Sequence, residues 1–248
     1  MMNTENNQIV SNQRFIGLFE EQKAALLSAD TPVVARIREE AFQAFKKSGF
    51  PDTRSEAWRH TDLSESLGKT WEYPLQPASA PDFRKVFRCN IPHLDTAVIG
   101  SFNGWYVSKD VPLMELGNGM IMGSLAQAKI KYPELVDRYY GTLSQDPGEG
   151  FTNLNTAFAG DGVFIYVPDR VKSPKPVQVI NVIQHDRNIF LQSRNLIILG
   201  DSASLSLVPC DDFYIHLASF PDSVTEIHLG AQATLDHYKL QNLNNDST

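Results

Sequence analysis

Five aspartates in the second half of the chain are the residues whose type best suits catalysis: Asp201, Asp211, Asp212, Asp222 and Asp236. If their strands lay side by side, two of the carboxylates could serve as general acid and general base on a polysaccharide, as in hydrolases and lyases built on a β-helix. Most of them, however, stand close to Gly or Pro, where Asp commonly stabilises a turn. A carbohydrate-active β-helix enzyme is therefore the alternative function.

Three histidines in the same half could converge on a metal such as iron: His216, His228 and His237. Their spacing does not support a ligand set. His228 and Glu226 are two positions apart, so their side chains lie on the same face of a strand. We expect this face, and His228 with it, to point away from the core, into solvent or an interface. We predict no metal ligand, no cofactor-binding residue and no catalytic residue in this chain.

The two cysteines, Cys89 and Cys210, are too few and too far apart for a disulfide framework or a metal-binding pair. Cys210 is followed by Asp211 and Asp212, and neighbouring carboxylates raise the pKa of a thiol. An activated nucleophile is therefore disfavoured. We expect Cys210 to be a buried or half-buried structural thiol.

Trp58, with Arg54 and Arg59 beside it, could form a recognition patch, because an aromatic ring next to guanidinium groups is a common contact surface. The structural interpretation is favoured. In it, Trp58 packs under the helices, and the arginines are solvated or paired with Glu56 and Asp62.

One stretch repeats after 30 residues, since Leu199-Gly200-Asp201-Ser202-Ala203-Ser204-Leu205 recurs as Leu229-Gly230-Ala231-Gln232-Ala233-Thr234-Leu235. Each copy reads as an apolar strand, a tight corner at Gly and a second strand. Repeats of this length are typical of solenoids, in which neighbouring coils bury each other's apolar faces. The repeat predicts a parallel β-helix, although a β-sandwich with two similar hairpins would give the same pattern.

The first half reads mainly as helices and short hairpins. Apolar spacing predicts a helix over residues 13–27 and a second one that begins at the N-cap Thr31 and stops at Gly49. Residues 65–92 read as irregular, Asn103-Gly104 predicts a hairpin between strands 97–99 and 105–107, and Ser124 begins a short helix that Pro133 interrupts. A loop follows over residues 144–150.

After this loop, alternating apolar residues predict strands over residues 163–167, 177–181, 196–199 and 205–207. Pro221-Asp222 reads as a strand boundary. The predicted fold is mainly β with α: an N-terminal helical α/β region (residues 1–150) and the start of a right-handed parallel β-helix (residues 151–248). Because strand and turn signals continue to the last residues, we expect a chain that is cut short at its C-terminus.

The composition is that of an ordinary cytoplasmic globular protein. The 248 residues are 42% hydrophobic and 21% charged, with a net charge of −7. No run of Lys and Arg could follow a nucleic-acid backbone, no apolar stretch is long enough to span a membrane, and the polar first residues are unlike a secretory signal. The chain also lacks a phosphate-binding loop for ATP.

Three stretches, in the same order as in the family, resemble SufD of the SufB/SufD family of iron–sulfur cluster assembly proteins. The first stretch is residues 49–63, which contain Pro51, Thr53-Arg54, Glu56, Trp58-Arg59-His60-Thr61 and Leu63. The second is residues 154–168, together with Lys175-Pro176-Val177. The third is the 30-residue repeat, with residues 194–200 and 224–230 leading into its two corners. At His60 the family usually has Tyr. The resemblance covers nearly all of the chain.

The resemblance implies a scaffold rather than an enzyme. Its expected partners are a SufB-like paralogue and a SufC-like ATPase, which would bind mostly through regions C-terminal to this chain. It places no cofactor in this portion, since an iron–sulfur cluster or a flavin would be held only by the full complex. The expected β-helix has no cap at its C-terminal end, so two copies of the chain could pair there as a homodimer.

Overall fold

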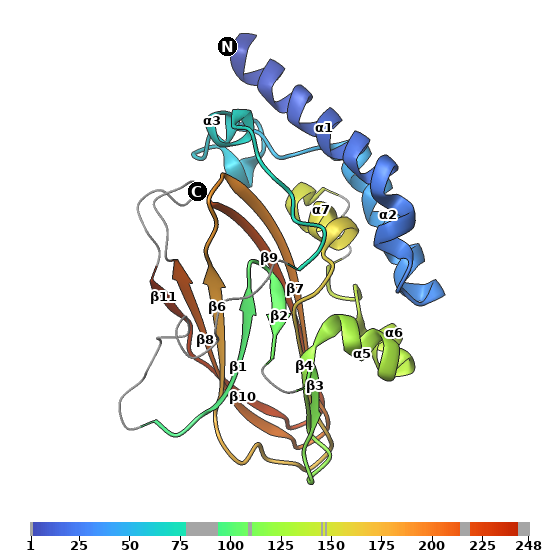
Figure 1. Ribbon diagram of the computed structural model, residues 1–248, viewed down its shortest axis with the longest axis vertical. Coiled ribbons are helices and arrows are strands. Elements are labelled where there is room, and N and C mark those ends of the chain that lie inside the picture. Colours follow the sequence, from blue (N-terminus) through green and yellow to red (C-terminus); the bar gives the residue numbers. More distant parts are fainter. Residues whose placement is uncertain are drawn as a thin grey trace.

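The structure, a computed structural model, describes residues 2–77, 94–108, 111–144, 146, 148–213 and 219–242. Two β-sheets face each other, and helices cover the outer face of one of them (Figure 1). Sheet A consists of β3 (Leu113–Glu115), β4 (Ile121–Ser124), β5 (Val163–Val167), β7 (Ile189–Leu199) and β9 (Ser219–Leu229). Sheet B consists of β10 (Thr234–His237), β8 (Ser204–Phe213), β6 (Val177–Ile183), β1 (Ala97–Phe102) and β2 (Trp105–Val107), with β11 (Leu240–Asn242) also paired to β8.

Two long helices open the chain: α1 (Met2–Leu27) and α2 (Pro32–Ser48). The Thr31 hydroxyl accepts a hydrogen bond from the Val34 amide at 3.2 Å, and α2 ends at Gly49, whose φ is 65°. The predicted cap and stop of the second helix are confirmed. The first helix begins earlier than predicted.

An aromatic cluster attaches these helices to the sheets. Phe15 lies at its centre, with edge-to-face contacts to Phe45, Phe50 and Phe190. Two short helices, η1 (Glu56–Trp58) and α3 (Ser64–Gly68), follow α2. The predicted irregular connection 65–92 therefore contains the end of α3, and its residues 78–92 lie outside the described residues.

The predicted hairpin of β1 and β2 is confirmed, with Phe102 opposite Trp105. Asn103 and Gly104 both have positive φ, 49° and 81°, as the tight hairpin turn requires. A second hairpin, β3 with β4, was not predicted from the sequence.

Three further helices follow β4. Ser124 caps α5 (Leu125–Lys131) by accepting from the Gln127 amide at 3.1 Å, and Pro133 begins α6 (Pro133–Tyr139), as the sequence predicts. The sequence does not predict α7 (Gly150–Phe158). Most of its side chains are buried, because it lies between α2 and sheet A, and its polar residues are Asn and Thr, which are weak helix formers.

From β5 to β10, consecutive strands alternate between the two sheets. From β7 on, each of them pairs in parallel with the strand two positions earlier: Phe164 with Leu196 and then Glu226 in sheet A, and Val177 with Leu207 and then His237 in sheet B. Leu199 and Leu229, the first residues of the two repeat copies, are direct partners. The copies thus stack as strand, corner and strand, not as two hairpins.

The corners stack as closely as the strands. The Asp169 carboxylate accepts from the Asp201 amide at 2.9 Å, and the Asp201 carboxylate accepts from the Ala231 amide at 2.8 Å. A Cβ on Gly200 would lie 2.7 Å from the Asp169 amide nitrogen, so only Gly fits there. The corner at Asp169 is a third copy, which the sequence analysis missed because its residues differ from the other two.

The core between the sheets is apolar and includes Ile99, Ile165, Val179, Ile197 and Leu205. One predicted boundary is wrong, since Pro221 and Asp222 lie inside β9. Within the part of the chain that the structure describes, β9 pairs on one side only, with β7, and a strand at such a position tolerates proline. The molecule is a mixed α/β protein with two mixed sheets. A domain boundary near residue 150 stays a prediction, and strands from both sides of it share the sheets.

Candidate functional site

The space between the sheets contains a cavity of about 360 Å³. Apolar side chains such as Val163, Val179 and Leu207 line one part of it. Another part is lined by a row of polar side chains that are direct partners across sheet B: Ser101, Asn181, Asp211 and Gln241.

Hydrogen bonds connect this polar row. The Ser101 hydroxyl donates to Asn181 Oδ1 at 2.7 Å, and Asn181 Nδ2 donates to Asp211 Oδ1 at 2.8 Å. Lys239 Nζ lies 3.0 Å from Asp211 Oδ2. The carboxylate of Asp211 is thus neutralised and held in place, which is the role of a structural group.

The other aspartates do not join Asp211. Asp201 stabilises a corner, and Asp236 accepts from the Ser206 hydroxyl at 3.3 Å. Asp212 follows Asp211 on β8 and so projects to the other face of the sheet. Asp222 lies on β9, where its carboxyl is enclosed. No two of these five carboxylates are held together as an acid–base pair, so the geometry does not favour the carbohydrate enzyme.

The histidines are also apart. His228 packs its ring on Tyr139 of α6, with 4.8 Å between centroids, and its Nε2 is 3.5 Å from the Thr142 hydroxyl. It points away from the inter-sheet core, as predicted, and meets a helix there. His237 lines the cavity, and His216 lies outside the described residues. Within the described ranges, no three His, Cys, Asp or Glu residues are grouped to hold a metal ion.

Cys210 is buried, which confirms the structural interpretation of this thiol. It lies on β8, and Gln178 Nε2 of β6 donates to its Sγ at 3.4 Å. Cys89 lies outside the described residues.

Trp58 is half-buried and packs on Phe151 of α7, with 5.3 Å between centroids. Arg59 pairs with Glu56 at 2.9 Å, as expected, whereas Arg54 pairs with Asp52 rather than Asp62. This group therefore holds the chain after α2 against α7, which is the structural role that the sequence analysis favoured.

The two ends of the strand stack differ. At one end the hairpins β1–β2 and β3–β4 continue the sheets with antiparallel strands. At the other end, β9, β10 and β11 have no further strand beside them among the described residues. Apolar side chains are exposed at this open end, including Leu229, Tyr238 and Leu240.

A buried ion pair between Arg194 of β7 and Glu226 of β9 was not identified from the sequence. Arg194 Nη2 lies 2.6 Å from Glu226 Oε1, and both side chains are almost fully buried. The Glu226 carboxylate also accepts from the amides of Gly141 and Leu143, at 2.9 and 3.1 Å. Both residues lie on strands that carry other polar residues as well, so the sequence gives no signal that this pair is buried.

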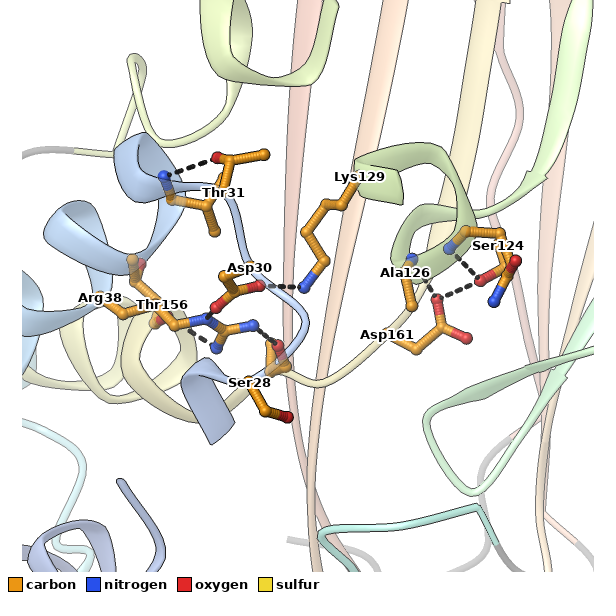
Figure 2. A network of polar contacts seen from close by, with 12 residues as sticks. Ser28, Asp30, Thr31, Arg38, Ser124, Ala126, Lys129, Thr156 and Asp161 are labelled. Atoms are coloured by element: carbon orange, nitrogen blue, oxygen red, sulfur yellow. Dashed lines mark hydrogen bonds and ion pairs between the residues drawn. The ribbon is translucent and has the colours of Figure 1, made fainter. Parts of the chain in front are cut away.

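A second buried network joins the helices to one another (Figure 2). The carboxylate of Asp30 binds both Arg38 Nε and Lys129 Nζ, the latter at 2.6 Å. Arg38 also donates to carbonyls at the end of α7, including that of Ala159 at 2.7 Å. One carboxylate thus connects the α1–α2 turn, α2, α5 and α7.

Asp161, also drawn in Figure 2, fixes the start of α5. Its Oδ1 accepts from the Ser124 hydroxyl and the Ala126 amide, both at 2.9 Å, and its Oδ2 accepts from the Tyr106 amide at 3.2 Å. Burial raises the pKa of Asp161, and these hydrogen bonds oppose the shift. Both networks are structural clamps without access to solvent.

None of the described helices combines the length and the apolar character that crossing a membrane requires. Comparison with known proteins identifies relatives. Over 236 residues the chain is 22% identical to an iron–sulfur cluster assembly SufBD family protein of Synechocystis, covering 92% of this chain and 51% of the relative. It is 30% identical over 189 residues to a SufBD family protein of Staphylococcus saprophyticus, covering 74% of this chain and 39% of that one.

The chain spans about half the length, or less, of these curated relatives. The family model described as the SufBD protein N-terminal region matches residues 9–179, which include α2, η1, both hairpins, α7 and β5. The chain belongs to the SufBD family of iron–sulfur cluster assembly proteins, and it matches the N-terminal region of that family.

Proposed function

We propose that this chain is the N-terminal part of a SufD-type scaffold subunit of the cytoplasmic SUF machinery for iron–sulfur cluster assembly, and that it is not an enzyme by itself. Its partners are a SufB-like paralogue and a SufC-like ATPase. Family membership supports the assembly role. The observation that carries the scaffold role is the strand stack, which has hairpins at one end and unpaired strands at the other.

The stack supports the finer fold prediction, a right-handed parallel β-helix. Strands alternate between two sheets and pair in parallel with registers of 30 or 32 residues, as in Leu199 with Leu229 and Phe164 with Leu196. Each corner accepts hydrogen bonds from the next. Such coils add one after another, and each new coil satisfies the backbone of the previous one.

The mechanism is positional. The stack supplies a rigid, edge-bearing surface for the SufB-like partner. ATP is hydrolysed by the SufC-like partner, and a nascent cluster or a flavin is held by the full complex, so this portion contributes no ligand. The clamps around Asp30 and Glu226 keep the helical layer fixed on this base.

A chimera tests this proposal. The matched N-terminal half of the Synechocystis relative is replaced by this chain, and the chimera is purified with SufB-like and SufC-like proteins of Synechocystis. We expect the chimera to retain both partners and this chain alone to retain little of the ATPase. A folded chimera that retains neither partner, while the unaltered relative retains both, would reject the scaffold role. Circular dichroism and gel filtration verify folding.

A further inference from the structure

The end of α7 contacts two buried arginines, Arg38 of α2 and Arg194 of β7, through a single residue. The backbone carbonyl of Thr156 accepts from Arg38 Nη1 at 3.3 Å, and its hydroxyl accepts from Arg194 Nη1 at 2.8 Å. The same hydroxyl donates to the Thr152 carbonyl at 2.8 Å, so its direction is fixed by the helix. Arg38, Thr156 and Arg194 are each at most 2% exposed.

Through Thr156 the two buried ion pairs are parts of one polar network. At one end, Asp30 of the α1–α2 turn binds Arg38 (Figure 2). At the other end, Glu226 of β9 binds Arg194. The network therefore runs from the α1–α2 turn through α2, α7 and β7 to β9.

Tyr140, at the end of α6, supplies a second connection. The centre of its ring lies 4.8 Å from the guanidinium carbon of Arg194. The ring is buried in the apolar cluster that joins α2, α6 and β7. The next residue, Gly141, donates its amide to Glu226 Oε1 at 2.9 Å. A polar route through Thr156 and a packed route through Tyr140 thus both connect α2 with β9.

Burial makes the members of this network depend on one another. A guanidinium that loses one of its acceptors in a buried site retains its charge, and water does not replace the lost partner until the site opens. Hydrogen bonds that share a residue also strengthen one another in such surroundings. Local opening that frees one end of the network therefore weakens the other end.

We propose that α2, α7 and β9 form one cooperative unit, which opens and closes as a whole, and that Thr156 is its connecting residue. Opening of β9 therefore also loosens α2. Among the described strands, β9 pairs only with β7. A strand that pairs with its other side holds the whole unit closed, a consequence that rests on the proposed function, in which this edge is covered in the assembly.

Native-state hydrogen exchange of the full 248-residue chain in low concentrations of urea tests the unit. We expect amides of α2, α7 and β9 to share one opening free energy and one urea dependence, smaller than that of global unfolding. Separate opening free energies for α2 and β9 would overturn the proposal. Exchange of all three elements through global unfolding alone would overturn it as well.

Thr156→Val removes the hydroxyl that Arg194 uses and retains the carbonyl that Arg38 uses. We expect β9 to exchange about tenfold faster and α2 to change less, so that the shared opening is split in two. Thr152→Val is the matched control, because it is the same exchange one turn earlier and Thr152 meets Thr156 through its backbone carbonyl. A split in both variants, or in neither, would contradict the role of Thr156.

The chimera with the Synechocystis relative tests the effect of a covered edge. We expect α2 to exchange about tenfold more slowly in the chimera than in this chain alone. Unchanged exchange in a chimera that retains both partners would reject the cooperative unit and leave the scaffold role intact. Slower exchange in a chimera that retains neither partner would reject the scaffold role and support the unit.

Discussion

The guanidinium of Arg194 and the carboxylate of Glu226 lie 2.6 Å apart on neighbouring strands and hold the loop after α6 against the edge of sheet A. Arg194 also bonds Thr156 of α7 at 2.8 Å, and its guanidinium carbon lies 4.8 Å from the centre of the Tyr140 ring. This pair is thus one of the polar contacts that hold the helices on β9, together with the hydrogen bond from Asn155 Nδ2 to the Asp222 carbonyl.

Removing one member of the pair should destabilise the fold strongly. Glu226→Gln leaves the buried guanidinium unpaired, which we expect to cost about 3–5 kcal/mol in the free energy of unfolding, measured in urea. The double variant Arg194→Met with Glu226→Gln should lose less than the sum of the two single variants, because neither charge is then left alone. Additive losses would contradict the coupling.

The stacked corners make Gly200 sensitive to the smallest substitution. Gly200→Ala places a Cβ 2.7 Å from the Asp169 amide nitrogen, so we expect a loss of about 1–3 kcal/mol by thermal or urea unfolding. Gly17→Ala is the matched control: nothing lies within 4 Å of its Cβ position in α1, and the exchange should stabilise the helix by about 1 kcal/mol. Equal effects at both positions would refute the close stacking of corners.

Asp222 should make stability fall as the pH rises. Below the pKa of Asp222 in the unfolded chain, both states carry the proton and the group has no effect. Above it, only the folded state retains the proton, because burial raises the folded-state pKa. Unfolding then releases a proton, and stability falls by up to about 1.4 kcal/mol per pH unit until the folded-state pKa is passed.

Asp222→Asn should therefore raise the melting temperature at pH 7 and remove part of its pH dependence. Asp161→Asn is the informative contrast. Asp161 is also buried, but its oxygens accept from the Ala126 and Tyr106 amides, which an amide NH₂ group cannot do. We expect that exchange to cost about 1–3 kcal/mol at every pH. The same sign of effect for both variants would contradict this assignment.

Asp30 serves two buried cations, so its loss should affect the whole helical layer. In Asp30→Asn the charges of Arg38 and Lys129 lose the carboxylate that they share, and we expect a cost of about 3–5 kcal/mol together with faster hydrogen exchange in α2 and α7. Glu40→Gln breaks the exposed pair with Arg36 and should cost less than about 0.5 kcal/mol. Similar costs would show that the buried network is not the clamp.

Local signals in the sequence predicted the parts of the fold that depend on neighbouring residues. The Thr31 cap, the Asn103-Gly104 turn and the alternation of β5 are of this kind, since each is determined within a few positions. The 30-residue echo predicted which strands become partners, because stacked coils repeat the same environment.

Tertiary context decided the rest. Helix α7 begins at a Gly and contains two Asn and two Thr, which are weak helix formers, so its packing against α2 and sheet A rather than local propensity makes it a helix. Pro221 suggested a strand boundary, yet an edge strand accommodates it. The partnership of Arg194 with Glu226 depends on strand register and on the loop that covers it, neither of which a single charged position reveals.

We propose that this chain supplies the base of a SufBD-family scaffold, and native mass spectrometry of the chimera described above, purified with its partners, is the decisive measurement. We expect one mass that contains the chimera, the SufB-like paralogue and the SufC-like ATPase, as with the unaltered relative. A folded chimera found only as a free subunit, under conditions where the relative is fully assembled, would contradict it.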